Sequence, residues 1–379
     1  MVTLFWLALI GACYSYFIYP LILAINTRQE STEQASSQGD SELPFLSLII
    51  TVHNEEKVIE KKLENSLAID YPPDKREILV ASDYSSDNTD AIVTAMSERG
   101  VILVPSGARN GKEYAQLQAI LKARGEILVF SDAATEIPPD AFLLIADIFR
   151  DRRIGAVSSE DQFVATDGKI VGEGLYVRYE MWLRKLESRA AGLVGLSGSF
   201  FCARREVCED WDILVPSDFN TALNAVTRGY KAVTDNRLKG IYKDVNDPQL
   251  EFNRKVRTVI RGITSIARKL EVLNPLKFGM FSFQVWSHKI MRWMVPWFML
   301  LTLLLSFPVY GAGVIYKLIL LLEIVFLGCS LTGQLLHSSR EQIFIRIPYY
   351  FTLSNLAIVK ATILFIFGKR ITVWTPSKR

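Results

Sequence analysis

An uncharged apolar stretch near the start of the chain places the strongest constraint on its fold. Residues 4–25, LFWLALIGACYSYFIYPLILAI, contain no charged side chain over 22 positions. As a helix with a rise of about 1.5 Å per residue, this stretch is long enough to cross a hydrocarbon core of roughly 30 Å. No Lys or Arg precedes it and Arg28 follows it. The positive-inside rule therefore predicts a retained anchor, with the N-terminus outside and the following chain in the cytoplasm.

The C-terminal third of the chain contains further apolar segments. Residues 293–309 and 314–336 are apolar runs on either side of the turn-like sequence YGAG, and together they predict a transmembrane hairpin over 293–336. The last apolar stretch, 349–367, has basic residues on both sides. Parity under the positive-inside rule favours a segment lying in the cytoplasmic interface, with a full crossing as the alternative.

These segments divide the chain into an anchor, a middle domain and a membrane-associated C-terminal part. The boundaries predicted from composition are an N-terminal anchor (1–27), a polar linker (28–43), an α/β domain (44–245), basic and interfacial helices (246–292), the hairpin (293–336), and an interfacial or membrane segment with a basic tail (337–379).

Short apolar runs alternate with helix-like segments in the middle domain. The runs are LSLIITV (46–52), EILVAS (77–82), VILVP (101–105) and EILVF (126–130). This alternation predicts an α/β fold with a mostly parallel, doubly wound sheet. Such sheets bind ligands at the carboxyl ends of their strands, so the residues just beyond each run are the candidates for a site.

Acidic and amide side chains follow these runs. His53, Asn54 and Glu55 come after the first run, Asp83 after the second and Asp132 after the fourth. Lys112 lies on the intervening loop. Carboxylates that converge on a cleft repel one another unless a cation or hydrogen-bond donors are present. The pattern therefore predicts that Asp132 faces a divalent metal ion carrying a phosphate ligand.

Charge and cysteine content exclude some other classes. The formal net charge is only +3, which does not indicate a general polyanion binder and predicts no nucleic-acid partner. The four cysteines form no CxxC or Cys/His metal spacing, so a reduced cytoplasmic domain accounts for them.

Seven segments in a fixed order resemble the family-2 glycosyltransferases with a GT-A fold, in particular their membrane-bound, processive-type branch. The resemblance covers most of 45–300, and its segments are TVHNEEKVI, VASDYSSDNTDAI, GKEYAQLQAI, VFSDAATEIPPDAF, SGSFFCARREV, PSDFNTALNAVTRGYKAV and FNRKVRTVIRG. The resemblance implies a Rossmann-like GT-A domain that transfers a sugar, with inversion, from a nucleotide-sugar to a growing polysaccharide or a lipid-linked glycan.

The resemblance also implies roles on the donor side. The positions of His53, Asn54, Glu55 and Asp83 bind the nucleotide base and ribose in the family, although an Asp after a strand also commonly caps a turn. Asp132 falls on the first acid of the DxD element, which holds Mg²⁺ or Mn²⁺ against the diphosphate. The second acid is replaced by Ala134, which removes one expected metal ligand.

Two further segments carry implied roles in transfer. Asp218 matches the catalytic base that takes the proton of the acceptor hydroxyl; by local sequence alone it also suits the N-cap of the following helix. Ser197, Gly198 and Ser199 match an element that passes near the acceptor, and an ordinary tight turn is the alternative.

Arg254 and Arg257 lie where the family often has QxxRW, with Arg254 in place of Gln and Thr258 in place of Trp. Three residues apart on a helix, the two guanidinium groups share one face and, with Lys112, suit binding of diphosphate oxygens. A basic face against anionic lipid is the alternative.

The sequence therefore predicts a multi-pass cell-membrane glycosyltransferase whose catalytic domain is cytoplasmic. Its expected partners are a nucleotide-sugar donor, a glycan or lipid-linked acceptor, membrane lipid, and an oligomeric or export partner. The competing interpretation, motivated by Ala134 and the altered QxxRW segment, is a non-catalytic membrane subunit that keeps the nucleotide-binding fold.

Overall fold

The structure is a computed structural model that describes residues 1–27, 42–164, 175–243 and 248–371. The predicted linker over 28–43 therefore lies almost entirely outside the described residues. The chain divides into two compact units. One comprises Met1–Ile22, Asn246–Ile263 and Phe283–Arg370, and the other comprises Leu23–Val245, Thr264–Ser282 and Ile371–Arg379.

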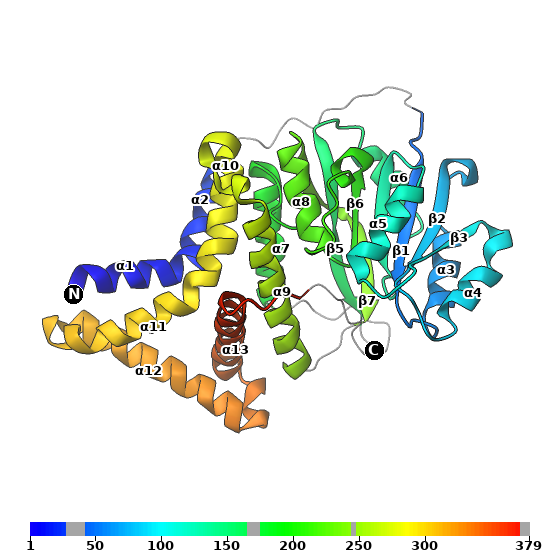
Figure 1. Ribbon diagram of the computed structural model, residues 1–379. Helices are drawn as coiled ribbons and strands as arrows, with labels where there is room; N and C mark the ends of the chain where they lie inside the picture. The colour runs from blue at the N-terminus through cyan, green and yellow to red at the C-terminus, as the bar shows by residue number, and fades with distance from the viewer. Residues whose placement is uncertain (28–41, 165–174, 244–247, 372–379) are drawn as a thin grey trace. The chain divides into compact units, whose positions relative to one another are not determined.

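The second unit contains a seven-stranded sheet with the order β3-β2-β1-β4-β6-β5-β7 (Figure 1). Its strands are β1 (Leu46–Val52), β2 (Arg76–Ser82), β3 (Val101–Pro105), β4 (Ile127–Asp132), β5 (Ile154–Val164), β6 (Phe200–Arg204) and β7 (Lys231–Lys243). The four strands predicted from apolar runs are β1 to β4, and they pair in parallel. β6 is antiparallel to both β4 and β5, whereas β5 and β7 are parallel.

Alternate residues of the parallel strands face two separate hydrophobic cores, as the period of a strand requires. Leu48 and Ile50 of β1 belong to a core that also contains side chains of α3 (Ile59–Leu67), α4 (Thr89–Ala95) and α6 (Ala141–Ile148). Ile49 belongs to the opposite core, with α5 (Lys112–Lys122) and α8 (Ser217–Thr227). Helices cover both faces of the sheet, so the doubly wound α/β prediction is confirmed.

Helix α8 ends through a local backbone signal that the sequence contains. Gly229 has a φ of +84°, a conformation that glycine adopts without a steric penalty. Its N–H donates to the carbonyl of Val226 at 3.0 Å, and the N–H of Tyr230 donates to the carbonyl of Ala225 at 2.8 Å. These bonds satisfy carbonyl groups of the last turn and release the chain into β7.

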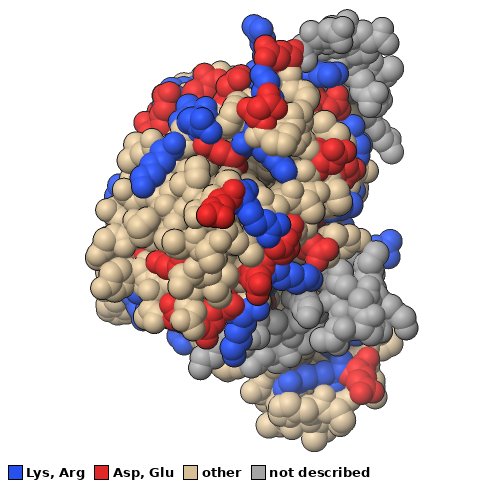
Figure 2. Space-filling model, turned by 90° about the vertical axis from the view of Figure 1, so that its right-hand side faces the viewer, with Lys and Arg blue, Asp and Glu red and all other residues tan. Residues whose placement is uncertain are grey.

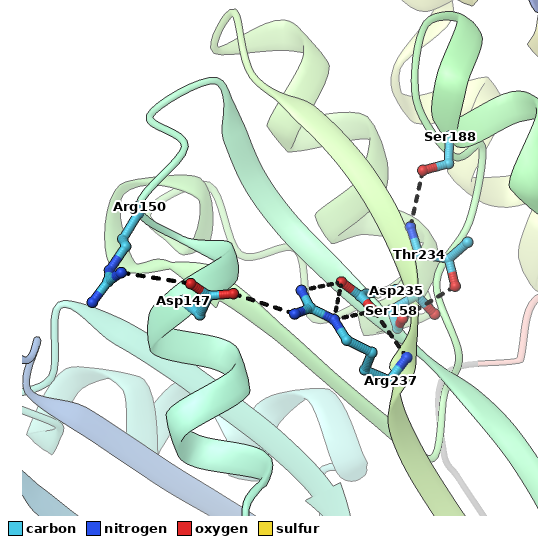
Figure 3. Close-up of polar contacts among 7 residues, drawn as sticks. All are labelled: Asp147, Arg150, Ser158, Ser188, Thr234, Asp235 and Arg237. Atoms are coloured by element: carbon cyan, nitrogen blue, oxygen red, sulfur yellow. Dashed lines mark hydrogen bonds and ion pairs between the residues drawn. The ribbon is translucent and has the colours of Figure 1, made fainter. Parts of the chain in front are cut away.

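Strand β7 is joined by polar contacts to three neighbouring elements (Figure 3). The backbone N–H of Thr234 donates to Ser188 of α7 (Leu175–Ala190) at 3.1 Å, and its hydroxyl donates to the carbonyl of Ser158 on β5 at 3.3 Å. Arg237 pairs with Asp235 on its own strand and with Asp147 on α6. Asp235 and Arg237 lie where the pairing of β5 with β7 shifts register, between Ser158 opposite Thr234 and Glu160 opposite Lys239, so these contacts tie β7 to α6 and α7 beside that irregularity.

The surface carries charges of both signs. Figure 2 shows Lys and Arg side chains interspersed with Asp and Glu over the face that it presents. This distribution agrees with the formal net charge of +3.

Four helices among the described residues are long and apolar enough to cross a membrane by length and composition: Val2–Asn26, Pro275–Ala312, Val314–Leu335 and Ile343–Ile366. The first comprises α1 (Val2–Cys13), a π-helical turn and α2 (Tyr19–Asn26); the others contain α10 (Pro275–Val285), α11 (Met291–Val309), α12 (Val314–Leu335) and α13 (Ile343–Ile366), and α9 (Pro248–Arg268) precedes them. The interfacial placement of 349–367 stays a prediction.

The first of these helices is tied to a later one by polar contacts in its π-helical turn. Ser15 donates its hydroxyl to the carbonyl of Ser287 at 2.9 Å, and the hydroxyl groups of Tyr14 and Ser287 are 2.9 Å apart. Ser287 itself lies in a second π-helical turn, Trp286–Ile290. The N-terminal segment is thus bonded to a helix more than 270 residues away in sequence.

A buried carboxylate connects the strands β1 and β2 to the start of β4. The hydroxyl of Ser47 donates to Glu77 Oε1 at 2.6 Å, and Arg124 donates to Glu77 through its backbone N–H at 2.5 Å and its Nε at 3.0 Å. Burial by itself would raise the pKa of the Glu77 carboxyl, but these hydrogen bonds and the charge of Arg124 hold the pKa below its ordinary value.

Glu77→Gln should lower the thermal unfolding midpoint of the full-length protein in detergent, because the charge-assisted bonds of a buried group are worth about 1–3 kcal/mol. The loss should be largest at neutral pH. It should shrink as the pH falls below about 4.5, where the carboxyl of the unfolded chain begins to protonate, and vanish once the folded carboxyl, whose pKa is lower, is protonated too. Glu64→Gln, at a half-exposed pair with Arg99, is the control and should change the midpoint little. Equal effects of the two changes would contradict this account.

Candidate active site

The sheet topology brings several chain segments to one edge. The carboxyl ends of β1, β2 and β4 meet there because these strands are parallel. β6 runs the opposite way, so the loop before it, residues 197–199, lies at the same edge. β5 is antiparallel to β6 and therefore also ends there.

The loops after β1 and β2 are bonded to each other. Asn54, with a φ of +54°, accepts the backbone N–H of Ser86 at 2.8 Å through its side-chain oxygen. The N–H of Glu55 donates to the hydroxyl of Thr89 at 2.8 Å. The structure thus places Asn54 and Glu55 side by side with the β2 loop, as their predicted joint role requires. Their contact with a nucleotide stays a prediction.

Asp83 has a structural function that can be read directly. It is fully buried, and its carboxylate accepts the N–H groups of Asn110 and Gly111 at 3.0–3.1 Å. Its carbonyl lies 2.8 Å from Nδ1 of His53. Asp83 therefore holds the loop that leads into α5, and its predicted contact with base or ribose remains untested by this geometry.

The centre of the site is an ion pair between Lys112 and Asp132. Lys112 is the first residue of α5, and its ammonium group donates to Asp132 Oδ1 at 2.6 Å and to the carbonyl of Gly198 at 3.0 Å. The N–H of Asp132 donates to the carbonyl of Ser199 at 2.9 Å. The strand end that carries Asp132 and the loop 197–199 are therefore fixed against one lysine.

Lys112 keeps its positive charge despite burial. Burial alone would lower its pKa, but the carboxylates of Asp132, Glu113 and Asp218 hold the pKa above its ordinary value. The influence of Asp218 means that this residue, 86 positions after Asp132 in the sequence, is near enough to act on the same ammonium group.

Asp218 lies directly against Gly198. A Cβ at Gly198 would be 3.2 Å from Asp218 Oδ2, closer than most real Cβ contacts. Asp218 Oδ1 accepts the N–H of Phe219 at 2.8 Å. The N-cap of α8 is Pro216, and Asp218 is in the first turn, so the predicted alternative of an N-cap aspartate is wrong. The missing side chain of residue 198 leaves room beside Oδ2.

Sequence reasoning missed two residues of this region. The first is Asp161, near the end of β5, whose Oδ1 accepts the hydroxyl groups of Ser197 at 2.5 Å and Ser199 at 2.9 Å. The strand itself was not predicted, because its run SSEDQ is polar. The sequence does contain a signal for this residue, because Asp161 follows the short apolar pair Ala156 and Val157 after three polar positions.

The second missed residue is Lys62. It is buried on α3, and its ammonium group donates to the hydroxyl of Ser131 at 2.7 Å and the carbonyl of Thr135 at 2.5 Å. Burial lowers the pKa of Lys62 to about 7, although the carboxylates of Asp132 and Glu136 act in the opposite direction. Lys62 thereby supports both ends of the turn that carries Asp132.

Arg254 and Arg257 lie on α9, in the part of the chain that belongs to the other compact unit. Arg254 pairs with Glu251 at 2.7 Å on its own helix. Their diphosphate role stays a prediction.

The residues present offer a metal ion one protein ligand. Over the described ranges of the chain, no three His, Cys, Asp or Glu side chains gather in a way that could hold a metal ion. A hard divalent cation on a nucleotide needs only one or two carboxylates, because phosphate oxygens and water complete its shell. Asp132 fits this requirement: its Oδ1 is bonded to Lys112, and Oδ2 has no bond to another described residue.

The parallel strands β3-β2-β1-β4, the antiparallel β6 and the acidic strand ends define an α/β protein of the GT-A class. A solved structure with this fold is a mannosyltransferase from Pyrobaculum calidifontis, PcManGT, in complex with GDP-Man and Mn²⁺. It is similar to this chain with a TM-score of 0.72 and 21% identity, over 97% of this chain and 100% of that one. At this identity the similarity establishes the fold.

The sequence comparison points to the same family. Residues 47–211 match the family described as Glycosyl transferase family 2, so this part of the chain is similar to that family. The predicted resemblance is thereby confirmed.

Two curated relatives are similar over part of their length. The poly-β-1,6-N-acetyl-D-glucosamine synthase of Staphylococcus aureus is 25% identical over 60% of this chain and 55% of its own length. The β-monoglucosyldiacylglycerol synthase of Trichormus variabilis is 26% identical over 47% of this chain and 40% of its own length. The chain spans about half the length of the curated relatives it matches.

Lys62→Met should lower the thermal midpoint of the full-length protein, because Thr135 and Ser131 lose a buried donor worth about 1–3 kcal/mol. Lys61→Met is a matched control at the adjacent position. The side chain of Lys61 is 81% exposed and pairs with Glu136 at the surface, so its loss should change the midpoint little. A midpoint unchanged by Lys62→Met would show that Lys62 does not support the Asp132 turn.

Proposed function

We propose that this protein is an inverting glycosyltransferase that moves a sugar from a nucleotide-sugar to a hydroxyl group of a glycan or lipid-linked acceptor. The observation that carries the proposal is the position of Lys112. Its ammonium group contacts Asp132 and the carbonyl of Gly198, and Gly198 in turn lies against Asp218. A residue suited to the diphosphate and a residue suited to the acceptor are therefore within reach of one cation.

Asp218 is the residue we assign as the general base. Its Oδ2 faces the space left by the missing side chain of Gly198, where a hydroxyl group can approach it. The carboxylate takes the hydroxyl proton as the oxygen attacks the anomeric carbon from the side opposite the leaving diphosphate. Attack from that side inverts the configuration in one step and needs no enzyme nucleophile.

Lys112 is the residue we assign to the leaving group. Its charge is maintained by the surrounding carboxylates, and it is held in place by two hydrogen bonds before the substrate binds. A fixed positive charge stabilises the diphosphate as negative charge develops on it, without reorganisation during the reaction. Asn54 and Glu55, on the bonded loops after β1 and β2, are assigned to the nucleoside.

A divalent metal ion, Mg²⁺ or Mn²⁺, fits Asp132 as its protein ligand. When bound, such an ion neutralises diphosphate oxygens and orients the donor. The Mn²⁺ of the mannosyltransferase complex supports this assignment. The DxD element offers the metal ion only the carboxylate of Asp132, because Ala134 stands at the position of the second acid.

We further propose that the protein is a multi-pass membrane protein with its α/β domain in the cytoplasm. The four candidate spans and the basic residue after the first support this placement. The names of the curated relatives, a polysaccharide synthase and a glycolipid synthase, support an acceptor that is a glycan or a lipid.

The proposal is tested with purified full-length protein in detergent and a panel of UDP-N-acetylglucosamine, UDP-glucose and GDP-mannose. Release of nucleoside diphosphate is measured in Mg²⁺, in Mn²⁺ and in EDTA. Wild type should turn over one donor in the presence of a metal ion, and Asp218→Asn should reduce transfer by at least a hundredfold with unchanged donor affinity. The reason is that a general base contributes about 10²–10⁴-fold to such reactions.

Two results would contradict this proposal. If wild type binds a nucleotide-sugar but releases no nucleoside diphosphate from any donor, the protein is a non-catalytic subunit with a glycosyltransferase fold. If Asp218→Asn retains full turnover, the base is another residue.

Gly198→Ala should reduce transfer at least tenfold while leaving the thermal midpoint nearly unchanged. The added methyl group would be 3.2 Å from Asp218 Oδ2, so it displaces the carboxylate and fills the space beside it. Gly107→Ala is the matched control, because a Cβ there meets no atom within 4 Å. Equal turnover in the two variants would show that the space at residue 198 is not used by a substrate.

A further inference from the structure

We propose that Asp161 is a second carboxylate of the acceptor site, which binds a non-reacting hydroxyl group of the acceptor beside the hydroxyl that Asp218 deprotonates. This inference rests on the proposed function and adds a residue that positions the acceptor. Asp161 contacts the acceptor, in this proposal, and takes no proton from it.

The first observation is the bonding of Asp161 to the loop 197–199. Its Oδ1 accepts the hydroxyl groups of Ser197 at 2.5 Å and Ser199 at 2.9 Å, and these two hydroxyl oxygens are 2.9 Å apart. Both donors belong to residues next to Gly198, the residue that lies against Asp218. Because consecutive Cα atoms are about 3.8 Å apart, the two carboxylates reach the same three-residue loop.

The second observation is the strand register, which places the carboxylate at the correct edge. β5 pairs with β6 from Ala156 opposite Ala203 to Ser158 opposite Phe201. The hydroxyl of Ser159 donates to the carbonyl of Phe200 at 2.7 Å, one step further along. Asp161 therefore comes after the paired region, beside the loop that precedes β6. On the other side of that loop, Asp132 donates its N–H to Ser199.

Hydrogen bonds to residues other than Asp161 also fix the loop 197–199. The N–H of Ser197 donates to the hydroxyl of Ser158 at 2.7 Å, and Arg184 of α7 donates to the same hydroxyl at 2.5 Å. Lys112 donates to the carbonyl of Gly198. The positions of the Ser197 and Ser199 hydroxyl groups are therefore determined before a substrate binds, and so is the position of Oδ1.

The third observation is the state of the second carboxylate oxygen. Asp161 is only partly buried, and its Oδ2 makes no hydrogen bond or ion pair within the part of the chain that the structure describes. An ionised carboxylate accepts several hydrogen bonds, so Oδ2 retains its capacity. A sugar has adjacent hydroxyl groups, and a carboxylate that accepts one of them is a charge-assisted contact with a defined direction.

The division of roles between the two carboxylates follows from their surroundings. Oδ1 of Asp161 accepts two serine hydroxyl groups, which fix this carboxylate against the loop 197–199. Asp218 accepts one backbone N–H at Oδ1 and presents Oδ2 to the space at Gly198. Asp218 therefore suits proton transfer, and Asp161 suits the choice of which hydroxyl group is presented to it.

The test separates transfer to the acceptor from hydrolysis of the donor by water. Full-length wild type, Asp161→Asn and Asp161→Ala are assayed in detergent with the donor that wild type turns over. The acceptor probes are short β-1,6-linked N-acetylglucosamine oligomers and diacylglycerol. Asp161→Asn keeps the shape of the side chain and can still accept from the serines, so the protein should fold.

Asp161→Asn should raise the KM for the acceptor by about ten- to a hundredfold, as expected for loss of a hydrogen bond to a charged group. The rate of donor hydrolysis and the KM for the donor should stay within about twofold of wild type. Asp151→Asn is the matched control. Asp151 accepts hydrogen bonds from Arg153 just before the opposite end of β5, and its loss should leave all three quantities unchanged.

Three outcomes would overturn the inference. An unchanged acceptor KM in both Asp161 variants shows that the carboxylate does not bind the acceptor. Equal loss of hydrolysis and transfer, with a lower thermal midpoint, assigns Asp161 to folding alone. Absence of turnover in wild type with every donor overturns the proposed function and this inference with it, whereas the first two outcomes leave the proposed function standing.

Discussion

The buried ammonium group of Lys112 is the interaction on which the site depends. It joins the end of β4 to the loop before β6 through Asp132 and Gly198, and these segments run in opposite directions in the sheet. An unpaired lysine in this position would lose several kcal/mol of solvation. The carboxylates around it compensate for that loss, so the arrangement of acids at this edge serves the stability of Lys112 as well as the donor binding that we propose.

The same edge shows why a parallel sheet suits this chemistry. Strands that run in one direction deliver several loops to one place, and the loops after β1 and β2 are bonded to each other through Asn54 and Thr89. The carboxylate of Asp83 accepts hydrogen bonds from the backbone N–H groups of Asn110 and Gly111, just before α5. The first residue of that helix is Lys112. Hydrogen bonds to Asp83 at the end of β2 therefore help to position Lys112 after β3.

The sequence predicted those parts of the site that follow directly from a strand. Asp132 comes at the end of a four-residue apolar run, and the parallel order of the strands is implied by the helices between them. Asp161 escaped prediction because its strand is polar where it ends. Lys62 escaped because Lys61 and Lys62 are adjacent and look alike in sequence. Only the rotation of α3 against the sheet decides that one is 81% exposed and the other buried. Helical spacing places Lys62 on the buried face with Ile59 and Leu63, but lysine is rarely buried, so its residue type concealed what its position indicated.

The replacement of the second DxD acid by Ala134 is consistent with the charges that surround it. Asp132 and Lys112 cancel one another formally, so one divalent ion would balance the two negative charges that a diphosphate carries. A carboxylate at residue 134 would add a negative charge to a turn that Lys62 already supports from beneath. Burial lowers the pKa of Lys62 to about 7, so Lys62 holds its proton less firmly than an exposed lysine does. An alanine at residue 134 therefore adds no further negative charge to a site where Asp132, Glu113 and Asp218 already surround Lys112.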